Sequence, residues 1–365
     1  MPFDLDRALR DALERGASDL HIKVPSPPRI RVAGELEELR GFGPVRAEDT
    51  AELRDRVIGS ELKRRQLDEE GSCDLSFHTE FGRFRVAAFT QRGSASFVFR
   101  AIPAAPDTSQ LGLPPVVMSW ADVQRGLVVV TGPTGAGKST TCAALVDIVN
   151  RNRTCHILTI EDPIEYLHRD QRALVCQREI GLDAPDYLHA LRAALRQDPD
   201  VILVGEVRDE ETAMTALRAA ETGHLVMCTM HTLDAAETIQ RFVDLFGATR
   251  SELARQMLAG TLVGICSQRL IPGSSGGRVL NAEVLVNSSR VRDMIATSSA
   301  QSDVRHAIAE GDYYGMRTFD QCLLAHVREG RVDRDDAVTY ATAPHDFKLM
   351  LASTEADAPH VPAIF

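Results

Sequence analysis

The sequence predicts a two-domain protein in which a small α+β domain precedes a larger α/β domain built on a parallel sheet. Its 365 residues are too many for one ordinary hydrophobic core. Residues 104–118, which include PDTSQLGLPP, are rich in proline and small side chains and are typical of a linker. From residue 126 onward, short apolar runs alternate with helical patterns, as strands and crossover helices do in a parallel sheet.

The α+β domain is expected over residues 1–103. Its first helix, residues 4–15, has its leucines on one face, and Gly16 follows as a stop. The segments SDLHIKV and PSPPRIRVAGELEEL predict a strand and then a strand–turn–strand, and residues 48–69 predict a surface helix. Residues 81–102 alternate apolar side chains with arginines, which predicts a hairpin with one apolar and one arginine-bearing face.

The α/β domain is expected over residues 119–343, and its first strand leads into a glycine-rich loop. The loop, GPTGAGKS, has the GxxxxGK[ST] pattern and opens a helix, which is the context that a phosphate-binding loop requires. Its backbone N–H groups and the helix N-terminus attract phosphate. We expect Lys138 to reach the β- and γ-phosphates of a nucleotide and Ser139 to ligate Mg²⁺. The predicted nucleotide-binding residues are Gly132, Pro133, Thr134, Gly135, Ala136, Gly137, Lys138, Ser139, Thr140 and Thr141.

Two further strands of the expected sheet end in acidic residues. The segment HILTIED ends in Glu161 and Asp162, and VILVGE ends in Glu206. Because the carboxyl ends of parallel strands meet at one edge of a sheet, these acids should lie beside the phosphate loop. We expect Glu206 to orient and deprotonate a water molecule, and Glu161 and Asp162 to act through Mg²⁺ or its waters. Acidic strand ends can also serve solubility alone, but the loop upstream favours a role in catalysis.

Two histidines, His224 and His231, bracket the apolar run LVMCTM. A strand of this length spans about 20 Å, so the two side chains cannot bind one ligand. Only Cys228 lies between them, without a second thiolate at ligand spacing, which argues against a zinc site. Further along, a hairpin follows residue 265, helical patterns continue to about 342, and a disordered tail is expected over residues 344–365.

Composition narrows the class of protein. The formal net charge of −11 disfavours sequence-neutral nucleic-acid binding, and none is expected. Seven cysteines without a CxxC pair favour a reducing cytoplasm over a disulfide framework. The first residues are charged and amphipathic, unlike a signal peptide, and no apolar run approaches the ~18 residues of a membrane span. We therefore expect any membrane association to be peripheral.

Several long blocks of the sequence resemble one family. GPTGAGKSTT, TIEDPIEYLH, ALRAALRQDPDVILVGEVRDEETAMTALRAAETGHLVMCTMHT and GMRTFDQCL occur in order and resemble the type II/IV secretion ATPase superfamily. Within it, the similarity is greatest to the type IV pilus retraction (twitching motility) ATPases, the PilT family. The N-terminal segments GASDLHI, PPRIRVAGEL and GRFRVAAFTQRG are similar to the same family, so the resemblance covers about residues 4–343.

The resemblance implies a hexameric cytoplasmic ATPase that works at the inner face of the cytoplasmic membrane. Each subunit would have a PAS-like N-terminal domain that covers a RecA-like P-loop ATPase domain. The implied ligands are ATP, ADP and Mg²⁺. The implied partners are further copies of the chain, an inner-membrane pilus platform protein and, indirectly, pilin, with no integral membrane segment. Hydrolysis of ATP to ADP and phosphate would then drive pilus retraction.

The same resemblance assigns further site residues. His231 should lie level with the γ-phosphate, and we expect it to sense that group, whereas His224 stays open between a structural contact and function. Arg83 and Arg85 share a strand face, and we expect them to meet ATP phosphates of their own or a neighbouring subunit. A solvated strand face is the plainer alternative. Nucleic-acid binding is disfavoured because the hairpin's aromatic side chains lie on the opposite face.

Retraction and assembly motors of the superfamily differ in ways that the sequence addresses. Assembly and type II secretion relatives usually carry an additional N-terminal domain and a four-cysteine zinc site, which favours retraction here. One departure points the other way, because the retraction family typically has AIRNLI where residues 290–295 have RVRDMI. A pilus-assembly or type II secretion ATPase is therefore the alternative. A RecA-like DNA translocase is a distant one.

Overall fold

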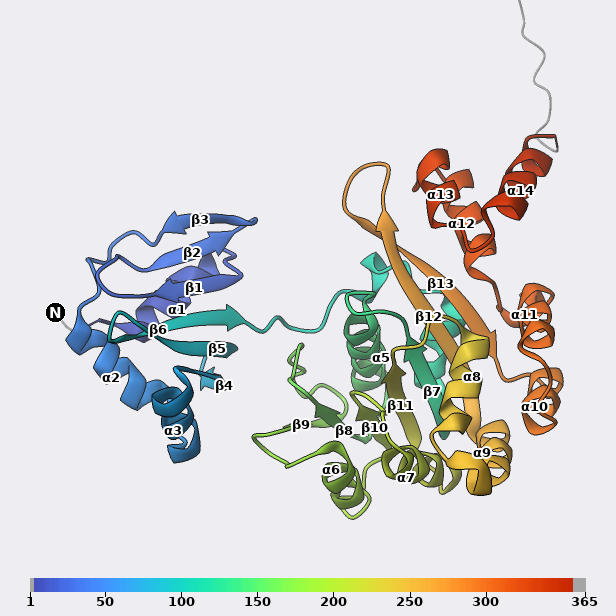
Figure 1. Ribbon diagram of the computed structural model, residues 1–365, viewed down its shortest axis with the longest axis horizontal. Helices are drawn as coiled ribbons and strands as arrows, with labels where there is room; N and C mark the ends of the chain where they lie inside the picture. The colour runs from blue at the N-terminus through green and yellow to red at the C-terminus, as the bar shows by residue number, and fades with distance from the viewer. Residues whose placement is uncertain (1–2, 357–365) are drawn as a thin grey trace, which may run out of the picture. The chain divides into compact units, whose positions relative to one another are not determined.

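The computed structural model describes residues 3–356 of the chain. These residues form two compact units that divide between Ala104 and Ala105. Figure 1 draws the first unit in blue and teal, and the second from green to red. Each unit has its own cluster of buried apolar side chains. Within the described residues, no helix is both long enough and apolar enough to cross a membrane.

The first unit is an antiparallel sheet covered by helices. Its six strands, as far as the chain is described, have the order β3-β2-β1-β6-β5-β4. Helix α1 begins after Asp4, whose carboxylate accepts a hydrogen bond from the backbone N–H of Arg7, and it buries Leu5 and Leu9 as predicted. The elements are α1 (Leu5–Glu14), β1 (Asp19–Ile22), β2 (Arg29–Val32), β3 (Glu35–Glu38), α2 (Ala47–Val57), α3 (Glu61–Glu70), β4 (Ser72–Thr79), β5 (Gly82–Gln91) and β6 (Ser94–Ala101).

The predicted arginine-bearing hairpin is confirmed as β5 and β6. Phe84 and Val86 of β5 are buried, and Arg85 between them is exposed. Two details differ from the prediction. Strand β4 pairs with β5 and was not foreseen, and residues 48–69 form two helices instead of one. The first helix ends at Val57, and Ser60, whose backbone is extended (φ −88°, ψ 127°), is the N-cap of the second helix.

The second unit is built on a sheet whose seven described strands have the order β13-β12-β7-β11-β10-β8-β9. All neighbouring strands are parallel except β12 and β13, so the predicted fold class is confirmed. The strands are β7 (Gly126–Thr131), β8 (His156–Glu161), β9 (Leu174–Glu179), β10 (Val201–Val204), β11 (Leu225–Met230), β12 (Leu262–Pro272) and β13 (Arg278–Val286). The helices are η1 (Thr108–Gln110), α4 (Pro115–Ser119), η2 (Trp120–Asp122), α5 (Lys138–Asn152), α6 (Tyr187–Ala194), α7 (Glu210–Glu221), α8 (Ala235–Asp244), α9 (Gly247–Thr261), α10 (Ser289–Ala296), α11 (Gln301–Ala309), η3 (Asp312–Tyr314), α12 (Phe319–Arg328), α13 (Arg334–Tyr340) and α14 (Pro344–Ala356).

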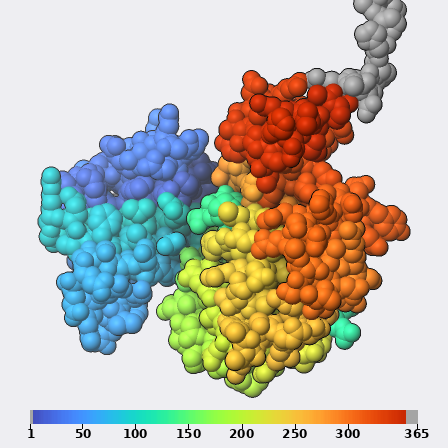
Figure 2. Space-filling model, turned by 45° about the vertical axis from the view of Figure 1, so that its right-hand side comes forward, coloured from blue at the N-terminus to red at the C-terminus, as the bar shows by residue number. Residues whose placement is uncertain are grey.

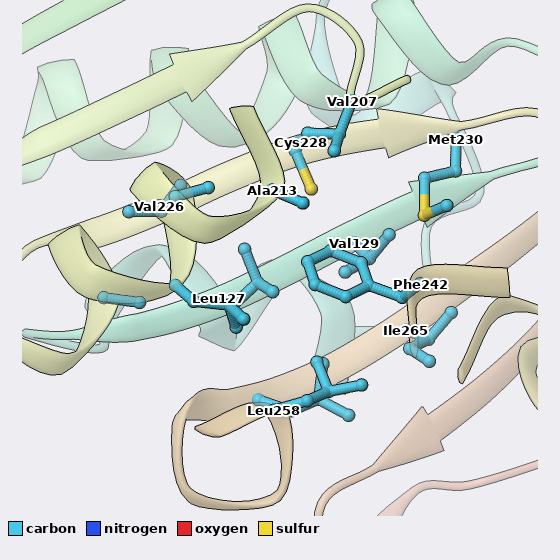
Figure 3. Close-up of a cluster of buried hydrophobic side chains, with 14 of the residues drawn as sticks. Leu127, Val129, Val207, Ala213, Val226, Cys228, Met230, Phe242, Leu258 and Ile265 are labelled. Carbon is cyan, nitrogen blue, oxygen red and sulfur yellow. The ribbon is translucent and has the colours of Figure 1, made fainter. Parts of the chain in front are cut away.

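Helices cover both faces of this sheet, because alternate residues of each buried strand point to opposite sides. Leu127 and Val129 of β7 pack against helices α7, α8 and α9, as Figure 3 shows with Ala213, Phe242 and Leu258. The intervening Val128 and Val130 join a second cluster that includes residues of α5 and Trp120. The sheet is thus rigidly held, and its carboxyl edge provides a fixed base for the loops that follow β7, β8, β10 and β11.

The segment expected to be a linker is partly ordered against the second unit. Residues 104–118 contain η1 and most of α4, and Leu113 and Val117 are buried in the same cluster as Trp120. Its proline and small residues resemble a linker by composition, but its spaced apolar side chains have a core to pack on.

The expected disordered tail, residues 344–365, also differs. Its first part is helix α14, because Phe347 and Leu351 lie one turn apart and are buried with Leu323 of α12. Residues 357–365 lie outside the described part of the chain. Helices α12, α13 and α14 form what we call the helical lobe, shown in red at one end of the second unit in Figure 2.

Candidate functional site

The glycine-rich loop lies between β7 and α5, as predicted. Gly132, Gly135 and Gly137 have φ values of 142°, 80° and 90°, which disfavour other residues. A Cβ on Gly132 would lie 2.4 Å from the carbonyl oxygen of Gln268 on β12, so no larger residue fits there. The loop is therefore held tightly against β12, and the N-terminus of α5 begins directly after it.

A cavity of about 480 Å³, here called the phosphate cavity, lies over this loop at the carboxyl edge of the sheet. That volume suits a small-molecule ligand. It brings together most of the predicted residues, namely Thr134, Gly135, Gly137, Lys138, Ser139, Thr140, Glu161, Asp162, Glu206 and His231. Gly132, Pro133, Ala136 and Thr141 do not line it. Thr141 is buried instead, and its hydroxyl accepts a hydrogen bond of 2.7 Å from the Gln268 amide.

Lys138 is held at the mouth of the loop by backbone oxygens. Its ammonium donates to the carbonyl oxygens of Gly132 (2.9 Å) and Pro133 (3.1 Å), and its Nζ lies 3.4 Å from Nδ1 of His231. Burial lowers the pKa of this lysine, although the carboxylate of Glu206 opposes the shift. The ammonium is consequently a poorly hydrated cation that is positioned to bind an anionic ligand.

Glu206 and His231 are in direct contact. The Glu206 carboxylate lies 3.3 Å from Nε2 of His231 and 2.6 Å from the guanidinium of Arg208. Burial by itself raises the pKa of Glu206, but the hydrogen bond from Arg208 and the charges of His231 and Arg208 outweigh burial and leave that pKa below its ordinary value. The side chains of Arg208, Glu206, His231 and Lys138 thus form one continuous polar chain, of which the last three line the cavity.

Glu161 differs electrostatically from Glu206. Its carboxylate accepts hydrogen bonds from the Thr159 hydroxyl (2.6 Å) and the Gln177 amide (3.1 Å), which are neutral donors. Burial raises the pKa of Glu161, and these hydrogen bonds only partly offset the rise. Glu206 therefore stays ionised more readily than Glu161.

The two histidines have separate surroundings. His224 lies before β11, and its Nδ1 is 2.9 Å from the carbonyl oxygen of Ala219 at the end of α7, which is a structural contact. His231 lies at the other end of β11 in the phosphate cavity. Arg83 and Arg85 belong to β5 of the first unit, where Arg85 is exposed. Their contact with ATP phosphates stays a prediction.

The structure adds residues to the phosphate cavity that the sequence analysis did not identify. Tyr187 comes from the start of α6, Gly205 follows β10, and Leu270 and Arg278 come from the β12–β13 hairpin. No local motif marks these residues. Leu270 and Arg278 belong to a hairpin that the sequence did predict. They could have been assigned to the cavity only if the position of that hairpin beside β7 had been known.

Known proteins resemble the chain over most of its length. The profile of the family described as type II/IV secretion system protein matches residues 2–311. The chain is 42% identical to the type IV pilus retraction ATPase PilT of Pseudomonas aeruginosa, over 94% of this chain and 100% of that protein. It is 41% identical to a twitching motility protein of Neisseria gonorrhoeae, over 84% of this chain and 82% of that protein. A crystal structure of the pilus retraction motor PilT with bound ADP matches with a TM-score of 0.83 at 41% identity, covering 95% of this chain and 100% of that chain.

Proposed function

The chain belongs to the type II/IV secretion system protein family, and we propose that it is an ATPase motor that retracts type IV pili and so powers twitching motility. The retraction ATPase and the twitching motility protein that it resembles support this proposal. The observation that carries the ATPase assignment is the polar chain of Arg208, Glu206, His231 and Lys138, which lies directly beside the phosphate loop.

In this proposal the loop and the start of α5 bind the phosphates of ATP. Backbone N–H groups of Gly135 and Gly137 and the ammonium of Lys138 would hold the β- and γ-phosphates. The donor set fits Mg²⁺, because the Ser139 hydroxyl and the Asp162 carboxylate line the same cavity and are hard oxygen ligands. When bound, the ion would neutralise charge on the β- and γ-phosphates. No cluster of three His, Cys, Asp or Glu side chains suited to a metal exists within residues 3–356, so phosphate oxygens and water would complete the coordination.

Glu206 would orient the attacking water and accept its proton. The water oxygen attacks the γ-phosphorus, the bond from that phosphorus to the ADP oxygen breaks, and the proton moves to the Glu206 carboxylate. Arg208 and His231 keep the carboxylate ionised until then, as the lowered pKa of Glu206 indicates. His231 contacts both Glu206 and Lys138, so loss of the γ-phosphate would change the surroundings of its ring.

The motor would work as a homo-hexamer on a platform protein of the inner membrane, with pilin moved indirectly. This wider setting is what the resemblance to the PilT family implies, and the retraction motor that the chain matches supports its retraction part. The charged replacements in RVRDMI, relative to AIRNLI, lie on the surface of α10. Val291 and Ile295 of α10 are buried, whereas Arg290 is exposed and forms a 2.7 Å ion pair with Glu310. The two charged replacements, Arg290 and Asp293, therefore change an exterior face and leave the apolar packing positions of α10 in place.

Glu206→Gln tests the enzymatic part of the proposal. The variant should bind ATP with wild-type affinity but hydrolyse it at least ~100-fold more slowly, because the amide cannot accept the proton. Glu221→Gln is the matched control, since Glu221 is an exposed residue at the far end of α7. Its turnover should equal that of the wild type. Undiminished hydrolysis by Glu206→Gln would overturn the assignment of the base.

A deletion strain tests the biological part. Loss of a retraction motor should leave cells piliated but unable to twitch, whereas loss of an assembly motor should leave them without pili. Electron microscopy of surface pili and a twitching assay on agar distinguish these outcomes. Complementation with Glu206→Gln should fail to restore motility. Bald deletion cells would replace retraction with the assembly alternative.

A further inference from the structure

Tyr187 places a phenol hydroxyl at the carboxyl edge of the sheet, between the ends of β8 and β10. It is the first residue of α6, and the Tyr187 hydroxyl fills space left by Gly205. A Cβ on Gly205 would lie 2.9 Å from that hydroxyl and 3.0 Å from the carbonyl oxygen of Ile160. The backbone N–H of Gly205 also donates to Ile160 (2.7 Å), which fixes both strand ends relative to each other.

The Tyr187 hydroxyl lines the phosphate cavity without a hydrogen-bond partner in the described part of the chain. Its ring packs against the main apolar cluster, so the side chain is anchored while its polar end is left to a ligand. A partly buried hydroxyl without a partner loses free energy unless a bound molecule supplies one. An acceptor on a molecule bound in the cavity would complete its hydrogen bonding.

The surroundings make this hydroxyl a hydrogen-bond donor. Burial raises the pKa of Tyr187, and the carboxylates of Asp162 and Glu206 raise it further, so the phenol keeps its proton. Asp162, Glu206 and Glu161 all line the same cavity. Tyr187 is thus a neutral donor among acidic groups, which is a useful property where a negatively charged phosphoryl group must be received.

We infer that Tyr187 is a further catalytic residue, whose hydroxyl donates a hydrogen bond to an oxygen of the γ-phosphoryl group. The inference rests on the proposed ATPase function. As the bond to ADP breaks, negative charge is redistributed among the phosphoryl oxygens and the attacking and leaving oxygens. A donor that is already in position stabilises this charge in the transition state. Lys138 would contact the phosphoryl group from the start of α5, and Tyr187 would contact it from the start of α6. The two donors therefore come from different elements.

Tyr187→Phe tests the inference by removing one oxygen while keeping the ring that packs in the core. The turnover number should fall about 10- to 100-fold, as expected for loss of a hydrogen bond to a charged group. KM should change little. Affinity for ADP should stay at the wild-type value, whereas affinity for ADP with aluminium fluoride, which mimics the transferring phosphoryl group, should fall by a factor similar to the turnover number.

Tyr313→Phe is the matched control, because Tyr313 is 92% exposed and lies in η3, outside the cavity. It should behave as wild type. Wild-type turnover and aluminium fluoride affinity in Tyr187→Phe would overturn the inference, as would an equal loss of affinity for ADP and for the fluoride complex. If the wild-type chain binds nucleotide without hydrolysing it, the proposed function fails separately, and the two affinities still decide the role of Tyr187.

Discussion

His231 connects the cation and the carboxylate of the phosphate cavity. Its Nε2 faces Glu206 at 3.3 Å, and its Nδ1 faces the Lys138 ammonium at 3.4 Å. An ammonium can only donate and a carboxylate can only accept, so in these contacts Nδ1 would accept from Lys138 and Nε2 would donate to Glu206. The imidazole thus connects the lysine of the glycine-rich loop to the proposed water-activating carboxylate.

His231→Ala should lower ATP turnover by about 10- to 100-fold and leave ADP binding unchanged, because Glu206 loses a partner that orients it. His231→Gln should recover part of the loss, since an amide can donate to Glu206. Steady-state hydrolysis and fluorescent ADP titration measure the two effects. Normal turnover of His231→Ala, together with normal motility of cells that carry it, would exclude the sensor role.

Glu283 is a buried acid in the apolar strand β13. It is 5% exposed, and its carboxylate accepts a 2.9 Å hydrogen bond from the backbone N–H of Ala235 at the start of α8. Burial raises the pKa of Glu283 to about 7, and the Asp234 carboxylate contributes to the rise. The folded protein consequently holds a proton there that the unfolded chain releases near its ordinary pKa of 4.5.

This pKa makes stability depend on pH in a defined direction. Between pH 4.5 and about 7 the native state binds more protons than the unfolded state, so its free energy of unfolding falls as pH rises. Glu283→Gln lacks this titration, and its stability relative to wild type should increase across that window by on the order of 3 kcal/mol. Urea unfolding at a series of pH values measures the difference. A difference that is constant with pH would contradict the prediction.

Sequence alone identified the residues whose chemistry is set by their position along one strand. Glu206 and His231 come within two residues of the ends of buried strands, and Lys138 ends the loop that follows β7. Parallel strands bring their carboxyl ends to one edge. Tyr187 and Arg278 could not be found in this way, because each reaches the cavity through the packing of a distant element. Their placement depends on long-range topology, which hydrophobic periodicity does not encode.

Among the helices and strands, too, local sequence patterns predicted some elements, and others were missed. The apolar runs predicted β7, β8, β10 and β11 because buried parallel strands are nearly uniform in hydrophobicity. Strand β9 was missed because it lies at the sheet edge and contains LVCQRE, a mixture of polar and apolar residues. Helix α14 was missed because small and acidic residues around it obscured the apolar pair that docks it.

The close packing of β12 against Trp120 depends on the absence of a side chain at Gly264. A Cβ on Gly264 would lie 2.4 Å from the Trp120 ring and 2.7 Å from the carbonyl oxygen of Leu285. Gly264→Ala should therefore destabilise the second unit by about 1–3 kcal/mol through overpacking. Urea unfolding followed by fluorescence measures this unit alone, because Trp120 is the single tryptophan of the chain.

Gly260→Ala is the control for that substitution. Gly260 is in helix α9, its added Cβ would meet nothing within 4 Å, and alanine is the better helix former, so the variant should be as stable as wild type or slightly more stable. Equal unfolding curves for the two variants would show that the Trp120 ring yields to the methyl group without cost.

At the scale of the whole molecule, the arginines of the first unit raise the question of which subunit's ATP they serve. Arg83 and Arg85 are predicted to contact phosphates in the chain's own site or in a neighbour's. Mixed rings can separate these cases. An Arg83→Ala/Arg85→Ala subunit retains Glu206, and a Glu206→Gln subunit retains both arginines, so each variant supplies what the other lacks only across a subunit boundary.

If the arginines act in a neighbour's site, co-expressing these two inactive variants should restore turnover. In a ring assembled at random from equal amounts, about a quarter of the sites would be complete. A mixture of Lys138→Ala with Glu206→Gln is the control, because both lesions affect the subunit's own site and no turnover should return. If the arginine mixture likewise stays inactive, the arginines serve their own subunit.

One strand connects the phosphate cavity to the helical lobe. Leu270 of β12 lines the cavity beside Gly137, while the next residue, Ile271, is buried among the side chains of the lobe, including Phe347. Beside them, the Arg269 guanidinium stacks 4.0 Å from the ring of Phe319. A single peptide bond thus joins the wall of the cavity to the lobe. Any force that displaces the lobe must strain this wall, so β12 has the position of a stiff mechanical link between nucleotide chemistry and an external load.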